Sequence, residues 1–352
     1  MNEDVMMKII LMVTSTFLLV ACLIPFIKKI ALHIGAVDIP NERKVHKKPM
    51  PRLGGLGIYF GFLLGYMLYG EASALMNSIL IGSFIIVLDG VVDDIKPLKA
   101  STKFLGQVVA SCIIVFYGNI VMHDISAFGI YINFGILAPF VTILFILGCI
   151  NCMNLIDGLD GLAGGISSIF FLTVGIICSI RGSFDLSFIL TFIMLGSTLG
   201  FLVHNFNPAK IFMGDSGSMF MGFIMAVITL LGFKNVMMSS IIVPLLILAI
   251  PILDTLFAII RRTLKGESIS KPDKFHIHHQ LLNRNLSQKQ TVLIIYFINA
   301  LFAFASIVYV LKNRELGYLI YGVLLMIVVT FVLKTNVVVE HHEKETRKHA
   351  KK

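Results

Sequence analysis

Charge is scarce in this sequence, since only 14% of its 352 residues are Asp, Glu, Lys or Arg, while 57% are hydrophobic. This shortage excludes an ordinary soluble domain. About 20 apolar residues are needed to cross roughly 30 Å of hydrocarbon. Eleven runs approach that length, at about 6–27, 53–70, 75–92, 104–122, 135–153, 162–180, 184–203, 216–233, 238–260, 291–311 and 316–333.

These runs predict an all-α polytopic membrane protein with about eleven transmembrane helices. The range is ten to twelve, because only four residues separate the second run from the third. The first run has no basic flank before it and no small-residue cleavage site after it, so we expect it to stay as the first helix. We expect one integral membrane domain over residues 1–334 and a charged cytoplasmic tail over residues 335–352.

Cysteine is also rare. All five cysteines lie in apolar runs, and Cys149 and Cys152 form a C-x-x-C without a second pair. A single such pair inside a hydrophobic segment is weak evidence for zinc or redox chemistry. We therefore interpret the cysteines as helix-packing residues: Cys22, Cys112, Cys149, Cys152 and Cys178.

Lysine and arginine are distributed unevenly between the predicted loops. When each loop is numbered by the runs that flank it, 24 of the 29 basic residues fall in the odd-numbered loops and the C-terminal tail. Cytoplasmic loops carry an excess of basic residues. The distribution predicts that the N-terminus is outside and that the odd-numbered loops and the C-terminus are cytoplasmic. A short β-hairpin is expected on the outer side, at 123–134.

The stretch NLIDGLDGLAGG, residues 154–165, follows an apolar run directly. A charge at hydrocarbon depth costs roughly 2.5 to 3.5 kcal/mol, so Asp157 and Asp160 should lie where a membrane helix meets water. If the turn after the run stays helical, residues three apart share a face. Both carboxylates could then hold one divalent cation or accept a proton. The alternative interpretation is a polar turn between two helices.

A second acidic cluster, VVDDIKPLKASTK, occupies residues 91–103. Asp93 and Asp94 end a predicted membrane helix, and Lys96 and Lys103 follow. Carboxylates that bind Mg²⁺ beside ammonium groups that bind phosphate oxygens would suit a metal-diphosphate site. A solvated helix end is the alternative. Asp89, one turn earlier, receives no role.

Acidic residues also occur at two later positions. In HNFNPAKIFMGDSGS, residues 204–218, Asp215 lies among small residues at the start of a predicted helix. Backbone N–H groups there could face an anion while the carboxylate holds a cation, or Asp215 could simply be the N-cap. Asp254 lies inside the ninth run, where an acid indicates either function or helix pairing.

Two basic segments complete the set. VHKKPMPRLGG, residues 45–55, is a stiff loop that could present Arg52 to phosphate, although such residues often serve only to orient a membrane protein. The run HIHH contains His276, His278 and His279. Neutral imidazoles could bind a metal and protonated ones a phosphate, and we favour substrate phosphate over a dedicated zinc site.

All five clusters fall in odd-numbered loops. Acidic residues contribute little to orientation, so orientation alone does not explain why the acids lie on the basic side. We therefore predict one site of Asp, His and Arg residues at the cytoplasmic surface of the bilayer. Such a site suits a water-soluble diphosphate that meets a lipid substrate.

The motifs VVDDIKPL, NLIDGLDGLAGG, FNPAKIFMGDSGS and KFHIHHQLL resemble those of the polyprenyl-phosphate N-acetylhexosamine-1-phosphate transferases. These are integral membrane enzymes that begin bacterial cell-envelope glycans. HIHH and PRLGG resemble the branch that transfers N-acetylglucosamine 1-phosphate from UDP-N-acetylglucosamine to undecaprenyl phosphate, for teichoic acid or related polymers. The sequence departs from the family pattern at Asp89, which is usually apolar, and in LLNRNLSQKQ, which lacks a glycine before Leu-Ser.

The resemblance implies roles for individual residues. Asp93 and Asp94 would bind Mg²⁺ or deprotonate the lipid phosphate, Asp157 and Asp160 would act in catalysis or nucleotide contact, and Asp215 would be a Mg²⁺ ligand together with Asp94. Residues expected to bind substrate are Arg52, Lys96, Lys103, Asn154, Asn205, His276, His278 and His279.

The implied reaction is an attack of the lipid phosphate on the β-phosphorus of UDP-N-acetylglucosamine, with Mg²⁺ or Mn²⁺ as cofactor and UMP as leaving group. Direct displacement is favoured over an aspartyl intermediate, because a carboxylate that binds Mg²⁺ is a poor nucleophile. Expected partners are the two substrates and the bilayer of the bacterial cytoplasmic membrane. No nucleic acid is expected, and a homodimer stays open.

Three alternatives belong to other branches or classes. One is a peptidoglycan-type phospho-muramoyl-pentapeptide transferase. Another is a lipid or nucleotide-sugar transporter, which would place its charged groups near mid-membrane. A CDP-alcohol phosphotransferase would contain a D-G-x₂-A-R run, and the sequence has DGLAGG instead.

Overall fold

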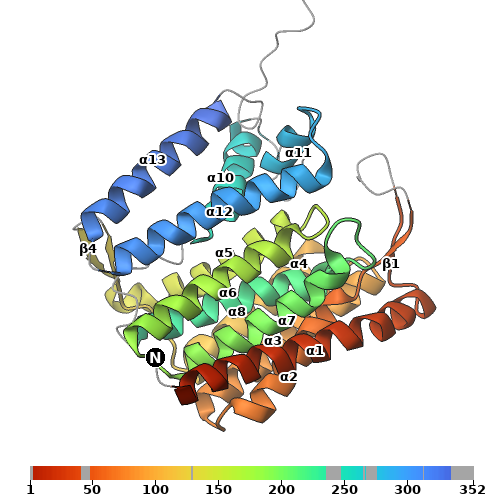
Figure 1. The fold of residues 1–352 in the computed structure, drawn as a ribbon, viewed down its shortest axis with the longest axis horizontal. Coiled ribbons are helices and arrows are strands. Elements are labelled where there is room, and N and C mark those ends of the chain that lie inside the picture. Colours follow the sequence, from red (N-terminus) through yellow and green to blue (C-terminus); the bar gives the residue numbers. More distant parts are fainter. Residues whose placement is uncertain are drawn as a thin grey trace, which may run out of the picture.

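The computed structural model describes residues 3–40, 48–127, 130–234, 247–264, 266, 276–311 and 313–333. Within these ranges the chain is an α-helical bundle with two small hairpins (Figure 1). The helices are α1 Glu3–His33, α2 Gly54–Tyr69, α3 Ala74–Ile95, α4 Ala100–Cys112 with a π-helical turn Ile113–Tyr117, α5 Ala138–Ile156, α6 Leu162–Arg181, α7 Leu186–Asn205, α8 Gly214–Lys234, α10 Ala249–Leu264, α11 Ile277–Leu282, α12 Gln288–Val310 and α13 Arg314–Leu333.

The polytopic membrane fold is confirmed. In the described residues, nine helices are long and apolar enough to cross a membrane, and α2 is a shorter apolar helix of 16 residues. The count of eleven stays a prediction, because much of the run at 238–260 lies outside the described residues. The orientation in the membrane also stays a prediction. The expected tail, 335–352, and residues 45–47 of the basic loop lie outside the described residues as well.

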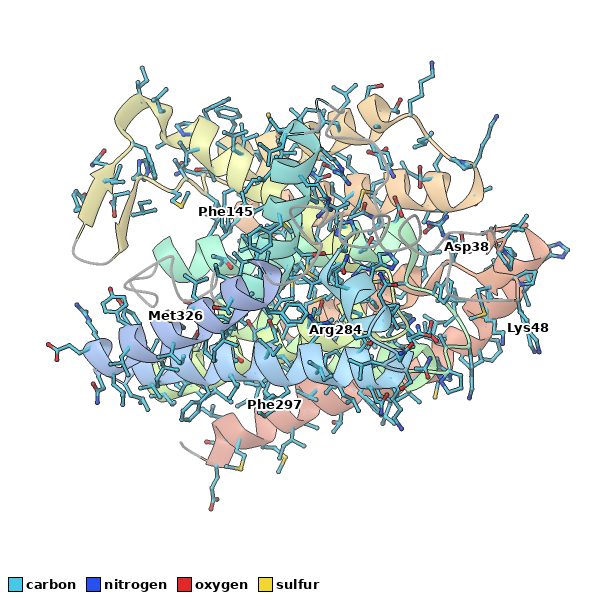
Figure 2. All side chains as sticks on the ribbon, turned by 90° about the horizontal axis from the view of Figure 1, so that it is seen from above. Asp38, Lys48, Phe145, Arg284, Phe297 and Met326 are labelled. Atoms are coloured by element: carbon cyan, nitrogen blue, oxygen red, sulfur yellow. The ribbon has the colours of Figure 1, made fainter. Side chains whose placement is uncertain are left out.

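Two antiparallel hairpins lie at opposite ends of the bundle (Figure 1). The strands β3 Asp124–Ala127 and β4 Ile130–Asn133 form the hairpin that alternation predicts at 123–134. The pair β1 Val37–Asp38 and β2 Met50–Pro51 was not expected, because each strand has only two residues. Asp38 and Lys48 mark that end of the molecule in Figure 2.

Several helices begin where a side chain satisfies backbone N–H groups that the helix leaves without partners. Ser73 accepts a hydrogen bond of 3.0 Å from the backbone N–H of Met76 at the start of α3. Asp185 caps α7 in the same way. Ser287 and Gln290 form a reciprocal capping box at the start of α12. These local signals set the helix boundaries near the polar loops.

Helix α8 is the centre of the bundle. It packs against α2, α3, α5 and α7 and is almost completely buried along its membrane-spanning length. Phe297 on α12 and Met326 on α13, labelled in Figure 2, are exposed and belong to the periphery. A Cβ on Gly55 of α2 would lie only 2.1 Å from the backbone N of Gly217 in α8. Glycine therefore lets the start of α8 lie against its neighbour.

Candidate active site

A cavity of about 360 Å³ lies at the end of the bundle where the loops before α2, α6 and α8 meet. Four of the five polar clusters contribute to its wall, together with the N-terminus of α12. The lining residues are Asp38, Arg52, Asn154, Asp157, Gly158, Leu159, Asp160, Asn205, Phe212, Gly214, Asp215, Ser218, His279 and Gln288. Segments that are far apart in the sequence therefore share one cavity, as their common placement in odd-numbered loops predicts.

Asp94 reaches the start of α8 without lining the cavity. Its carboxylate accepts hydrogen bonds from the backbone N–H of Asp215 at 2.9 Å and from that of Ser216 at 3.1 Å. The Ser216 hydroxyl donates a third, at 2.8 Å. These N–H groups do face an anion, and that anion is the carboxylate of Asp94. Asp215 itself lies in the first turn of α8, which begins at Gly214.

Arg52 joins three carboxylates. Its guanidinium lies 3.3 Å from both Asp94 and Asp215 and 3.6 Å from Asp38. Burial by itself lowers the pKa of Arg52, but the carboxylates of Asp94 and Asp215 outweigh that effect, and the pKa is raised. Arg52 is a permanent cation in the cavity wall, and much of its charge is already paired within the protein.

Lys103 makes the corresponding link from α4. Its ammonium nitrogen lies 2.5 Å from Oδ2 of Asp215 and 3.4 Å from Oδ2 of Asp93. The other oxygen of Asp93 accepts the backbone N–H of Leu98 at 2.8 Å. The two adjacent acids therefore diverge: Asp93 contacts its own loop and Lys103, whereas Asp94 contacts α8. Lys96 is exposed and does not line the cavity.

Asp157 and Asp160 line the cavity from the loop between α5 and α6. The condition that the turn stays helical is not met, because α5 ends at Ile156 and α6 begins after Gly161, whose φ is +79°. Both side chains nevertheless line the same cavity. Burial, with the nearby carboxylate of Asp215, raises the pKa of Asp157 to about 7, although Arg52 opposes this shift. Asp157 is thus the lining acid that a cation would help to ionise.

The loop of the second acid pair is braced by its neighbours. Oδ2 of Asp160 accepts hydrogen bonds from Asn207 at 2.9 Å and from the backbone N–H of Ala209 at 3.0 Å. Asn205 is buried, accepts the N–H of Gly161 at 3.0 Å and donates to the carbonyl of Ile211. The polar groups of Asp160 and Asn205 thus join the loop before α6 to the loop before α8.

The model of glycosyl transferase family 4 matches residues 76–233. A probable undecaprenyl-phosphate N-acetylglucosaminyl 1-phosphate transferase of Bacillus subtilis is 40% identical to the chain, covering 93% of it and 92% of the relative. The chain belongs to glycosyl transferase family 4. The resemblance that the motifs indicate is confirmed.

Two further relatives cover most of this family 4 chain. The decaprenyl-phosphate N-acetylglucosaminephosphotransferase of Mycolicibacterium smegmatis is 32% identical, over 88% of the chain and 84% of the relative. The undecaprenyl-phosphate alpha-N-acetylglucosaminyl 1-phosphate transferase of Haemophilus influenzae is 33% identical, over 78% of the chain and 80% of the relative. Each of these similarities covers more of the chain than residues 76–233, which the family model matches.

The three histidines of the HIHH cluster differ in their surroundings: two are buried and one lines the cavity. Asp254 lies 2.8 Å from Nδ1 of His276 and accepts the backbone N–H of Ile277 at 2.7 Å, so it anchors the start of α11. His276 and His278 are buried, and His279 lines the cavity. Burial lowers the pKa of His278 to about 3. His278 is therefore neutral at physiological pH and could contact a phosphate only as an uncharged donor.

Asn285 stands directly before Leu286 and Ser287, where the motif resemblance leads us to expect glycine, and its φ is +64°. Asparagine adopts this left-handed conformation more readily than most residues other than glycine. Asn285 therefore takes a backbone conformation that glycine would also allow.

Several residues of the site carry no sequence signal. Gln288 lines the cavity and accepts a hydrogen bond from Asn207 at 3.0 Å, and the hydroxyl of Tyr296 donates to the carbonyl of Gly161. Both belong to α12, which reads only as an apolar span. Ser218 accepts a hydrogen bond of 2.9 Å from Asn154. Ser218 lies three residues after Asp215, and residues three apart on a helix share a face. This spacing could have predicted Ser218 as a site residue.

The residues around the cavity fit a Mg²⁺ ion. No group of three metal-ligating side chains occurs among the residues that the structure describes. Mg²⁺ commonly takes only one or two carboxylates and completes its shell with water and substrate phosphates. Asp157 and Asp215 both line the cavity, and each carboxylate disfavours the charge of the other. A divalent cation between them would relieve that repulsion.

Proposed function

We propose that the protein transfers N-acetylglucosamine 1-phosphate from UDP-N-acetylglucosamine to undecaprenyl phosphate and releases UMP. The observation that carries the proposal is the single cavity that Asp157, Asp160, Asp215 and Arg52 line at the end of a membrane-helix bundle. The names of the Bacillus and Haemophilus relatives support undecaprenyl phosphate as the acceptor and N-acetylglucosamine 1-phosphate as the transferred group. The product would be the lipid-linked first sugar of a cell-envelope polymer such as teichoic acid.

The proposed cofactor is Mg²⁺, with Mn²⁺ as a substitute. Bound Mg²⁺ would neutralise the negative charge of the diphosphate. Asp157 and Asp215 are the residues that would hold it, because their carboxylates line the cavity. The metal role of Asp94 stays a prediction, because Asp94 does not line the cavity and its carboxylate accepts the backbone N–H groups of Asp215 and Ser216.

The side chains of the site would act mainly by positioning. A phosphate monoester has its second pKa near 6, so the lipid phosphate is largely ionised at neutral pH and needs little help from a base. Lys103 and Arg52 hold Asp215 from two sides. Fixed groups of this kind favour an in-line attack of the lipid oxygen on the β-phosphorus, with UMP as the leaving group.

The proposed activity is tested by measuring UMP release from a panel of UDP-sugars. The purified protein in lipid nanodiscs receives undecaprenyl phosphate, Mg²⁺ and one UDP-sugar at a time. UDP-N-acetylglucosamine should be the preferred donor, and UDP-N-acetylmuramoyl-pentapeptide should release little UMP. Omitting undecaprenyl phosphate is the control for hydrolysis. UMP release from no UDP-sugar, or preference for the muramoyl donor, would overturn the proposal.

Two further measurements test the order of the reaction and its side of the membrane. Under direct displacement, lipid-free protein should not exchange labelled UMP into UDP-N-acetylglucosamine, and exchange would indicate an aspartyl intermediate. Lys99 is exposed in the loop that joins α3 and α4. In a cysteine-free background, Lys99→Cys should resist membrane-impermeant reagents added outside intact cells. External labelling would contradict a cytoplasmic site.

A further inference from the structure

The carboxylate of Asp94 accepts three hydrogen bonds and forms one ion pair. Oδ1 accepts the backbone N–H of Asp215 and lies 3.3 Å from Nε of Arg52. Oδ2 accepts both the backbone N–H and the hydroxyl of Ser216. A carboxylate offers about four lone-pair sites. Three hydrogen bonds and one ion pair therefore leave Asp94 little room for a metal ion or a substrate proton unless it gives up one of these contacts.

Burial separates Asp94 from Asp215. The side chain of Asp94 is 0% exposed, whereas that of Asp215 is 14% exposed and lines the cavity. A Mg²⁺ ligand must approach the ion to about 2.1 Å in near-octahedral geometry. Asp215 can do so from the cavity wall. Asp94 does not line the cavity, and its oxygens contact the backbone N–H groups of Asp215 and Ser216 in the first turn of α8.

The backbones of α3 and α8 are built to keep this contact. A Cβ on Gly90, one turn before Asp94, would lie 2.3 Å from Cα of Ser216. Gly214 has a φ of +73°, and a Cβ there would lie 2.3 Å from Oδ2 of Asp94. Both positions need glycine for the two helices to approach so closely. An anion at a helix N-terminus is also stabilised by the helix dipole.

We propose that Asp94 is a positioning residue, which caps α8 from the neighbouring helix and thereby orients Asp215 and Arg52 toward the cavity. The inference rests on the proposed function of the same site and assigns the role of Asp94 within it. Asp94 contacts neither the metal nor the substrate. Its negative charge holds the backbone N–H of Asp215 and the Nε of Arg52, and so sets the direction in which both side chains enter the cavity wall.

The test compares four variants for binding of Mn²⁺ alone, measured from the free Mn²⁺ signal by electron paramagnetic resonance. Ser216→Ala removes one donor to Asp94 and leaves every acid in place, so Mn²⁺ affinity should fall about fivefold. Asp94→Asn should lower it about tenfold, and Asp215→Asn should abolish it. Ser78→Ala is the matched control, because its hydroxyl donates only to Leu75 within α3.

Coupling distinguishes positioning from direct ligation. Because Ser216 acts through Asp94, the double variant Asp94→Asn/Ser216→Ala should bind Mn²⁺ no more weakly than Asp94→Asn alone. Excess Mn²⁺ should restore most of the UMP release of Ser216→Ala and Asp94→Asn but not that of Asp215→Asn. Amide hydrogen exchange at Asp215 and Ser216 should become faster in Asp94→Asn and stay slow in Asp215→Asn.

Specific outcomes would overturn the proposal. If Ser216→Ala binds Mn²⁺ as tightly as the wild type while Asp94→Asn loses binding as fully as Asp215→Asn, Asp94 is a direct ligand. If Asp94→Asn fails to fold, Ser216→Ala still tests the proposal. A folded Ser216→Ala variant with wild-type Mn²⁺ affinity would refute the coupling between Ser216, Asp94 and the metal site. A wild-type protein that shows the expected Mn²⁺ pattern but releases no UMP would instead refute the proposed reaction and leave the role of Asp94 standing.

Discussion

The protein contains two acid pairs at helix ends, and their surroundings differ sharply. Asp93 and Asp94 end α3 and are buried among donors, so that each carboxylate is committed to the protein itself. Asp157 and Asp160 follow α5 and line the cavity. Both pairs are aspartates at the C-terminal end of an apolar helix, Asp93 and Asp94 within its last turn and Asp157 and Asp160 just beyond it. The pairs differ in whether their carboxylates line the cavity.

The difference has a structural origin in the elements that lie opposite each pair. Asp94 meets the first turn of α8, where unpaired N–H groups bind it. Asp157 lines the cavity, and its burial, together with the nearby carboxylate of Asp215, raises its pKa to about 7. One pair therefore stabilises the framework of the site, while the other leaves a negative charge that is incompletely compensated. The latter is the arrangement that attracts a cation.

The largest expected effect lies where the two pairs meet. Asp215 forms ion pairs with Arg52 and Lys103, which also contact the first pair. It lines the cavity together with both acids of the second pair. Asp215→Asn should lower kcat for UMP release on the order of a hundredfold or more, because a metal-binding charge is lost. EDTA should reduce wild-type release to background, and added Mg²⁺ should restore it. Full turnover in EDTA would contradict the metal role.

A pH titration sharpens the contrast by isolating Asp157. Because a proton and the cation compete for this carboxylate, Mg²⁺ affinity should rise about tenfold between pH 6 and pH 8. Asp157→Asn should remove most of that rise, whereas Asp94→Asn should retain it. Mg²⁺-dependent shifts in melting temperature at each pH provide the measurement. An unchanged pH profile in Asp157→Asn would show that another group titrates.

The same raised pKa predicts the stability of the metal-free protein. The folded state binds more protons than the unfolded state between the ordinary pKa of an aspartate and about 7. Stability should therefore fall as pH rises through this window. Asp157→Asn should flatten the fall in melting temperature, and saturating Mg²⁺ should offset it.

A smaller effect is expected at Asp160, whose oxygen is held by Asn207 and Ala209. Asp160→Asn keeps one carbonyl acceptor but loses the charge that strengthens both bonds. We expect kcat/KM for UDP-N-acetylglucosamine to fall about fivefold, with Mn²⁺ affinity nearly unchanged. Loss of Mn²⁺ binding in this variant would show that Asp160, like Asp157, is a metal ligand. The two acids would then have the same role.

The smallest effect concerns the brace behind the second pair. Tyr296→Phe removes the hydrogen bond from its hydroxyl to the carbonyl of Gly161. One such bond contributes about 0.5 to 1 kcal/mol, so we expect about a threefold fall in kcat/KM. Tyr318→Phe is the matched control, because its hydroxyl pairs with Tyr309, away from the cavity. Equal effects of the two variants would indicate a general loss of helix packing.

The amino-acid sequence by itself determined the membrane class, the polar clusters at helix ends and the short hairpin at β3 and β4. These features depend on the transfer free energy of whole segments and on local alternation, which are properties of neighbouring residues. The pattern also indicated that Asp157, Asp160, Asp215 and Arg52 belong to one site, because a shared side of the membrane constrains where loops can meet.

The tertiary structure alone decided which acid faces the cavity and which is buried behind it. Asp94 became a cap because glycines let α3 approach the start of α8, and no local pattern reports how closely two helices pack. The break at Gly161 separated Asp157 and Asp160 from a common helical turn, and Asp254 drew His276 inward while His279 stayed at the wall. Hydrogen-bond donors and acceptors find their partners across helices, so their pairing is a property of the packed bundle.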